Sequence, residues 1–343
     1  MNDIHRILQI LKERKMQKFA MATVIKVEGS AYRREGAKML IDENGTTFGM
    51  ISGGCLEEDL THHAKEVMQT HHPKIVTYDM KSEGDAGWGQ GAGCNGIIYV
   101  YIEETGWDLD KDQSCKSVWD LIYQKLISGK YVVSLLNIDK KQRMYCSEDG
   151  DLLNYPENAD SSLITYVESF LELGNRTANE KVDGQGEIIM ELFQPKERLY
   201  IFGAGPDVQP VVELAAKLDF SILLIDPRNK RCNPENFPTA DHYIVEHPHI
   251  FLQQNEIPQN SFVLIMTHNF QWDQKVLKYF VKKSIHYLGI LGPKRRTARL
   301  LDPEPIPDWI HSPVGMDIDA EGSEEIAVSI CAELIKKRKS IHK

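Results

Sequence analysis

The C-terminal part of the chain alternates short apolar runs with amphipathic segments, a pattern typical of a parallel sheet covered by helices. Strands are expected over 199–202, 221–225, 243–245, 262–266 and 286–291, and helices over 208–218 and 271–282. A last helix is expected over 324–337, because acidic residues occupy its first turn, where the helix dipole favours them. The pattern predicts a Rossmann-like domain over residues 194–343.

The N-terminal part mixes helical and alternating patterns and predicts an α+β domain over residues 1–193. Asn44-Gly45 joins two of its apolar runs and is a strong hairpin signal. Helices are expected over 3–11, 56–69 and 117–127, and strands over 19–27, 37–42, 46–50, 74–78, 97–102, 131–138 and 142–146. The core is expected within residues 1–104, with residues 105–193 as an extension of the same domain. The predicted fold class is therefore α/β, an N-terminal α+β domain followed by a doubly wound parallel sheet.

Composition and charge narrow the classes of partner. Among 343 residues, 50 acidic side chains outnumber 40 basic ones, which gives a formal net charge of -10. This balance argues against a nucleic-acid partner and against docking on anionic lipid, since both need a basic face. The apolar runs are shorter than a membrane span, and no export signal is visible at the N-terminus. A cytoplasmic protein with reduced cysteines is expected.

A glycine turn marks the start of the C-terminal domain. Gly203-Ala204-Gly205 follows an apolar strand and precedes a helix, the context in which a helix N-terminus binds phosphate. Asp226 ends the next strand and is placed to accept hydrogen bonds from a ribose. These residues predict a nucleotide or NAD(P) site, although Val208 and Pro206 depart from the dinucleotide-binding pattern. A Rossmann-like turn that holds no dinucleotide is the alternative.

Two further groups follow strand ends of the same sheet. His268 with nearby Asp273 is a candidate acid–base or metal pair, and a hydrogen-bonded histidine without catalytic function is an equal alternative. Arg295, within Lys294-Arg295-Arg296, is a candidate anion contact.

The N-terminal domain carries two glycine-cysteine loops. Ser52-Gly53-Gly54-Cys55 lies between a strand and a helix, where the helix dipole favours the thiolate form of a cysteine. A second loop places Cys94 after Gly91 and Gly93, whose bare backbone lets an anionic ligand approach closely. For each cysteine the alternative is a small buried hydrophobe. Arg33 and Arg34 lie between strands and are candidate phosphate ligands, with a solvated turn as the alternative.

Several motifs, in one order along the chain, resemble the xanthine dehydrogenase accessory family of the XdhC/CoxI type. The resemblance covers about residues 20–102 and 198–333. It is carried by Gly49-Met50-Ile51-Ser52-Gly53-Gly54-Cys55-Leu56-Glu57, Trp88-Gly89-Gln90-Gly91-Ala92-Gly93-Cys94-Asn95-Gly96, Phe202-Gly203-Ala204-Gly205, Asp226-Pro227-Arg228 and Leu291-Gly292-Pro293-Lys294-Arg295-Arg296.

The resemblance implies a maturation factor without turnover of its own. Such a factor binds the molybdenum cofactor (molybdopterin), protects it while a cysteine desulfurase supplies its sulfido ligand, and helps deliver it to a xanthine dehydrogenase-type molybdoenzyme. Cys55 and Cys94 would contact the molybdenum, which a soft thiolate suits. A homodimer is the base-rate expectation. Two alternatives stay open: an NAD(P)-dependent oxidoreductase that uses Gly203, Gly205, Asp226 and His268, and an accessory subunit of xanthine dehydrogenase.

Overall fold

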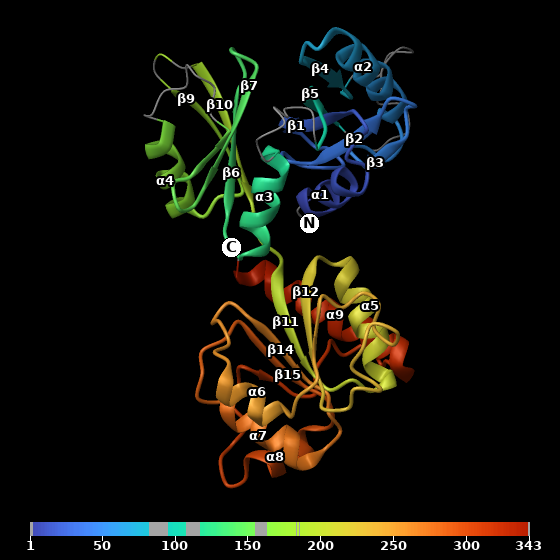
Figure 1. Cartoon of the computed structure of the whole chain (residues 1–343), viewed down its shortest axis with the longest axis vertical. Helices are drawn as coiled ribbons and strands as arrows, with labels where there is room; N and C mark the ends of the chain where they lie inside the picture. Colours follow the sequence, from blue (N-terminus) through green and yellow to red (C-terminus); the bar gives the residue numbers. More distant parts are fainter. Residues whose placement is uncertain are drawn as a thin grey trace. The chain divides into compact units, whose positions relative to one another are not determined.

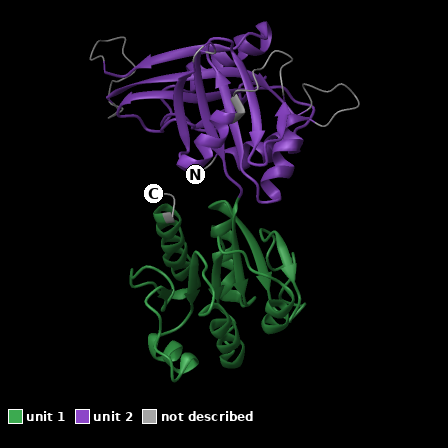
Figure 2. Ribbon diagram, turned by 90° about the vertical axis from the view of Figure 1, so that its left-hand side faces the viewer, with its two compact units in different colours: residues 1, 196–343 green, residues 2–195 purple. Residues whose placement is uncertain are grey.

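The computed structural model of the chain describes residues 3–81, 95–107, 117–154, 163–182, 184 and 186–341. The chain forms two compact units, residues 2–195 and residues 196–343 (Figure 2). None of the described helices is long and apolar enough to cross a lipid bilayer.

The first unit contains two antiparallel sheets, which we call the β1 sheet and the β6 sheet. The β1 sheet has the strand order β3-β2-β1-β5-β4, and the β6 sheet the order β8-β7-β6-β10-β9. The strands of the β1 sheet are β1 (Phe19–Gly29), β2 (Lys38–Asp42), β3 (Thr47–Gly49), β4 (Lys74–Asp79) and β5 (Gly96–Thr105). Those of the β6 sheet are β6 (Val132–Asn137), β7 (Gln142–Ser147), β8 (Leu152–Asn154), β9 (Thr177–Val182) and β10 (Gly186–Phe193). The helices are α1 (Ile4–Glu13), α2 (Glu57–Thr70), α3 (Val118–Ile127) and α4 (Leu163–Leu173).

Alternation along the strands separates the two faces of each sheet. In β1, Ala20 and Ala22 share a core with α2 on one face, while Phe19 and Met21 point to the other face and pack with α1 and α3. The β6 sheet contributes Phe193 to this second core, and its far face packs against α4. The sheets therefore bury a common layer, which α1 and α3 help to fill.

Two ion pairs, the first buried and the second partly buried, cross this layer in opposite directions. Lys38 of the β1 sheet, 1% exposed, donates to the Glu191 carboxylate of the β6 sheet. Arg143 of the β6 sheet donates through Nε to Glu103 of the β1 sheet at 2.6 Å. Burial lowers the pKa of Lys38, and the Glu191 carboxylate opposes that shift. Each sheet therefore supplies the counter-charge that the other needs.

The second unit is a parallel sheet in the order β13-β12-β11-β14-β15-β16. Its strands are β11 (Glu197–Phe202), β12 (Phe220–Ile225), β13 (His242–Ile244), β14 (Phe262–Ile265), β15 (Tyr287–Ile290) and β16 (Ile310–His311). Its helices are α5 (Gln209–Lys217), α6 (Pro248–Gln254), α7 (Phe270–Phe280), α8 (Lys294–Leu301) and α9 (Gly322–Ile341). Residues of α5 and α9 share one core on the sheet, and those of α6, α7 and α8 share another (Figure 1). The order reverses between β11 and β14, which confirms the doubly wound Rossmann-like fold.

Removing one partner of the Lys38–Glu191 pair is expected to destabilise the first unit strongly. In Lys38→Met the Glu191 carboxylate stays buried without its cation, and the free energy of unfolding should fall by about 3–5 kcal/mol. The double variant Lys38→Met/Glu191→Leu should recover most of this loss, because no uncompensated charge remains. Urea unfolding followed by circular dichroism measures both values. A double variant as unstable as the single one would show that packing, and not charge pairing, dominates here.

Candidate functional site

The loops that carry Arg33, Arg34 and Cys55 leave the β1 sheet at the same end. Neighbouring strands are antiparallel, so β1, β3 and β4 end where β2 and β5 begin. The chain enters and leaves the second glycine-cysteine segment at this end too, because Met80 N–H donates to the Gly96 carbonyl at 2.9 Å. Gly91, Gly93 and Cys94 themselves lie outside the described residues.

Glu57, the first residue of α2, organises the Cys55 loop. Its Oε1 accepts hydrogen bonds from the backbone N–H groups of Ser52 (2.8 Å) and Ile51 (3.3 Å). Its Oε2 accepts from the N–H groups of Gly54 (3.1 Å) and Leu56 (3.2 Å) and from the Ser52 hydroxyl. The backbone N–H groups of Ser52 and Gly54, which a glycine loop before a helix leaves free for an anion, are thus engaged by the chain's own carboxylate.

Glu57 was not a predicted site residue, although the motif ending in Leu56-Glu57 contained its signal. An acidic residue in the first turn of a helix after a glycine loop is a typical cap of unpaired N–H groups. Partial burial disfavours ionisation of Glu57, but the hydrogen bonds from the Ser52 hydroxyl and from backbone N–H groups outweigh it and lower its pKa. The carboxylate is therefore held in its charged form.

Cys55 is the exposed member of the four cysteines that the structure describes. Cys146, Cys232 and Cys331 are buried, and burial raises the pKa of each of these thiols, that of Cys331 to about 12. Gly53 is exposed beside Cys55, and the backbone N–H groups of both residues have no hydrogen-bond partner among the described residues. The loop therefore presents a thiol and two N–H donors on a pinned backbone.

The two candidate arginines differ in their contacts. Arg33 donates through Nη2 to Asp3 at 2.7 Å and through Nη1 to the Met50 carbonyl at 3.1 Å. Its guanidinium therefore braces the Cys55 loop, and is not an open phosphate clamp. Arg34 is exposed and has no ion-pair partner among the described residues, so it is the arginine that can reach a ligand.

In the second unit, Gly203 follows β11 and lies close against the backbone of Met266, which follows β14. Its φ is +119°, and an added Cβ would lie 2.3 Å from the Met266 carbonyl oxygen. At Gly205, an added Cβ would lie 2.3 Å from Asp207 Oδ1. Gly203 is therefore needed for close packing of the turn itself, whereas a Cβ at Gly205 would meet only the end of the Asp207 side chain.

Asp226 supports the glycine turn from the next strand. It is 1% exposed, and its Oδ2 accepts from the Ala204 N–H at 2.9 Å and from Arg228 Nη2 at 2.6 Å. Its Oδ1 accepts from the N–H and Nε of Arg228. Burial disfavours the charged form of Asp226, but the Arg228 hydrogen bonds prevail and lower its pKa. The residue expected to bind a ribose is engaged within the chain.

The predicted His268–Asp273 pair does not form. His268 Nε2 lies 2.8 Å from Asp207 Oδ2, so the histidine bridges the loops after β14 and β11. Asp273 lies in the first turn of α7, where it is buried and bonds to Thr267 Oγ1 (2.5 Å) and Arg296 Nη2 (2.6 Å). Spacing along the chain misled the prediction because the side chain of Asp273 points into the core. Arg296 is thereby used structurally, while Arg295 is exposed in the first turn of α8.

The described residues contain no group of three His, Cys, Asp or Glu side chains that could hold a metal ion. Cys55 is a candidate for a single contact to a metal that a ligand carries.

Glu57→Gln should loosen the Cys55 loop. An amide cannot accept from all the donors that meet the carboxylate, so the free energy of unfolding should fall by about 1–2 kcal/mol at neutral pH and Cys55 should alkylate faster. Because the pKa of Glu57 is lowered on folding, this stabilisation is present above its ordinary value of 4.5 and is lost as pH falls through the folded value. Urea unfolding across pH and iodoacetamide labelling measure these effects. Glu58→Gln, the neighbouring exposed carboxylate, is the control; equal behaviour of both variants would contradict the role of Glu57.

Gly203→Ala should destabilise the second unit more than Gly292→Ala does. Both residues have positive φ, +119° and +105°, so both substitutions strain the backbone. Only the first adds a clash with backbone, since an added Cβ at Gly292 meets the flexible Arg296 side chain at 3.4 Å. We expect a difference of about 2 kcal/mol in urea unfolding. Equal losses would mean that the turn after β11 can open without penalty.

Comparisons with known proteins agree with this architecture. The profile of the XdhC Rossmann domain matches residues 199–334, and that of the XdhC and CoxI family matches residues 13–79. The chain is 37% identical, over 99% of both sequences, to a probable xanthine dehydrogenase subunit of Bacillus subtilis strain 168. It is 23% identical to the molybdenum cofactor insertion chaperone PaoD of Escherichia coli K12, over 93% of this chain and 83% of PaoD.

A solved structure is also similar along the whole chain. The crystal structure of a xanthine dehydrogenase from Bacillus halodurans matches with a TM-score of 0.83 and 41% identity, covering 99% of this chain and 96% of that one. Identity at this level over nearly the full length confirms the resemblance found in the motifs around Cys55 and Gly203. The chain belongs to the XdhC/CoxI family.

Proposed function

We propose that this protein is an accessory factor that carries the molybdenum cofactor, holds it for sulfuration by a cysteine desulfurase, and hands it to a xanthine dehydrogenase-type enzyme. The observation that carries the proposal is the exposed Cys55 thiol on a loop that Glu57 pins. Similarity to a cofactor insertion chaperone and to a probable xanthine dehydrogenase subunit supports the same function.

The donors of the Cys55 loop fit both the molybdenum and the phosphate of the proposed cofactor. A cysteine thiolate is a soft ligand that suits molybdenum. The N–H groups of Gly53 and Cys55 and the exposed guanidinium of Arg34 suit a phosphate. We assign Cys94 as a second thiolate contact, since the described ends of its segment lie at the same end of the β1 sheet.

An exposed site suits a carrier better than a catalyst. Catalytic sites gain by excluding water from the reacting groups, whereas cargo that passes between proteins must stay accessible to both. Ser52 is buried, but Gly53, Gly54 and Cys55 are exposed. We infer that the factor acts without turnover of its own, in the cytoplasm and as a homodimer.

The second unit weighs against the dehydrogenase alternative. A dinucleotide places its pyrophosphate at the helix start after the glycine turn. Here Pro206 and Pro210 lack N–H groups, and the Asp207 carboxylate adds negative charge beside the turn. His268 bonds to Asp207 and is not set up by Asp273 as a proton-transfer group. These features disfavour a dinucleotide at this turn and support the carrier over the oxidoreductase.

Purification from a molybdate-fed host tests the proposal. We expect molybdopterin to copurify with the wild-type protein and to fall at least about tenfold in Cys55→Ser, by loss of the metal contact. Cys94→Ser should lose cofactor too, whereas Cys146→Ala, in the core of the β6 sheet, should retain it. Metal and pterin analysis after purification gives the content of each variant.

A pull-down separates the competing functions. The carrier should capture a xanthine dehydrogenase-type apoenzyme and a cysteine desulfurase. Protein that is free of pterin, captures neither partner and is thermally stabilised by NAD(P) would overturn the proposal in favour of an oxidoreductase.

A further inference from the structure

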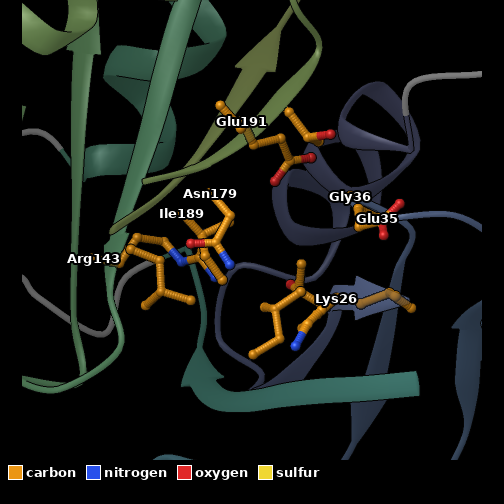
Figure 3. A pocket seen from close by; sticks show the side chains of 13 residues that line it. Lys26, Glu35, Gly36, Arg143, Asn179, Ile189 and Glu191 are labelled. Carbon is orange, nitrogen blue, oxygen red and sulfur yellow. The ribbon is translucent and has the colours of Figure 1, made fainter. Parts of the chain in front are cut away.

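A second site lies within the first unit, between the β1 and β6 sheets. There the structure forms a cavity of about 190 Å³ that is open on one side. In Figure 3, Arg143, Asn179 and Ile189 of the β6 sheet face Lys26 of β1 and Glu35 and Gly36 of the following loop. Lys26 and Asn179 are exposed and mark its open side. None of the lining residues belongs to the Cys55 loop, although Glu35 and Gly36 follow Arg34 in the loop between β1 and β2.

A buried guanidinium group with one unused nitrogen lines the cavity. The Arg143 side chain is 7% exposed, its Nε donates to Glu103, and its Nη1 donates to Ser134 Oγ at 2.8 Å. Its Nη2 is buried and has no partner among the described residues. A buried donor left without a partner costs about 1–3 kcal/mol, more when charged, and native proteins satisfy nearly all such groups by protein, water or ligand.

A second polar atom of the lining is also buried without a hydrogen-bond partner among the described residues. The Thr23 hydroxyl oxygen is buried and unpaired among the described residues, and Thr23 is 3% exposed. Thr23 lies on β1 and Arg143 on β7, so both sheets present an unsatisfied polar group to one space. Two such groups around one cavity indicate a binding position for a ligand atom that accepts hydrogen bonds.

The rest of the lining limits the size and the polarity of the ligand that the cavity can hold. Ile25, Leu136 and Ile189 pack in one apolar cluster and supply the apolar wall of the cavity. A dry cavity of about 150 Å³ holds benzene, so this cavity has room for one ring with a small substituent. Because Glu103 already pairs with Arg143, the free N–H groups can receive either a neutral carbonyl or a carboxylate.

We propose that this cavity binds a small planar molecule whose carbonyl or carboxylate oxygen accepts hydrogen bonds from Arg143 Nη2 and Thr23, with its apolar part against the β1 and β10 side chains. The site is distinct from the Cys55 loop and independent of cofactor carriage. Its ligand spans both sheets, and its binding therefore stabilises the first unit.

Calorimetric titration of the full-length protein with benzoate and with benzamide tests the proposal. The two probes share ring and shape, and a preference between them distinguishes a carboxylate ligand from a neutral carbonyl one. Arg143→Lys keeps the charge beside Glu103 but removes the planar fork, and should weaken binding at least about tenfold. Thr23→Val should weaken it severalfold while leaving the unliganded protein as stable or more stable, because a buried unpaired hydroxyl is removed.

The same Arg-to-Lys change at Arg14, which pairs with Asp42 outside the cavity, is the matched control and should leave binding unchanged. A crystal soaked with the tighter probe should show it against Arg143. The proposal is overturned if neither probe binds the wild-type protein at millimolar concentration and the cavity contains water only. It is overturned equally if binding survives unchanged in both Arg143→Lys and Thr23→Val.

Discussion

The first unit depends on two ion pairs that cross the layer between its sheets. Burying a lysine and an arginine is costly unless each meets a carboxylate, and each carboxylate comes from the opposite sheet. Neither sheet can therefore bury this face alone. The cavity between the sheets is lined by Arg143 and Glu191, one member of each pair.

Carboxylates hold the glycine turns of both units in the same way. Glu57 gathers the N–H groups of the Cys55 loop, Asp226 holds the turn after β11, and Asp207 bonds to His268 across two strand ends. Glycine turns of this kind bind anions in many proteins. Here the chain supplies the anions itself, so intramolecular hydrogen bonds hold the turns before any ligand arrives. Among the described residues around this loop, the Cys55 thiol, the N–H groups of Gly53 and Cys55, and the Arg34 side chain remain open.

Regular patterns made much of this fold predictable from the sequence. The parallel strands of the second unit are short apolar runs, and Asn44-Gly45 marks the β2–β3 hairpin. The strand β9 was missed because it lies at the edge of the β6 sheet and reads Thr-Ala-Asn-Glu-Lys-Val, with polar side chains left partly exposed. The Asp207–His268 contact joins residues 61 apart in sequence, which no local spacing reveals.

The arrangement around Cys55 also bears on how a carrier releases its cargo. A ligand held by many buried contacts leaves slowly, because each contact must be broken before the partner can take over. In the proposed carrier function, a molecule bound at this loop would make few backbone contacts, because Glu57 takes most of the donors, and its affinity would rest mainly on the thiolate. We infer that the intramolecular carboxylate tunes the site toward transfer: it keeps the loop rigid, which favours binding, while it removes donors that would make release slow.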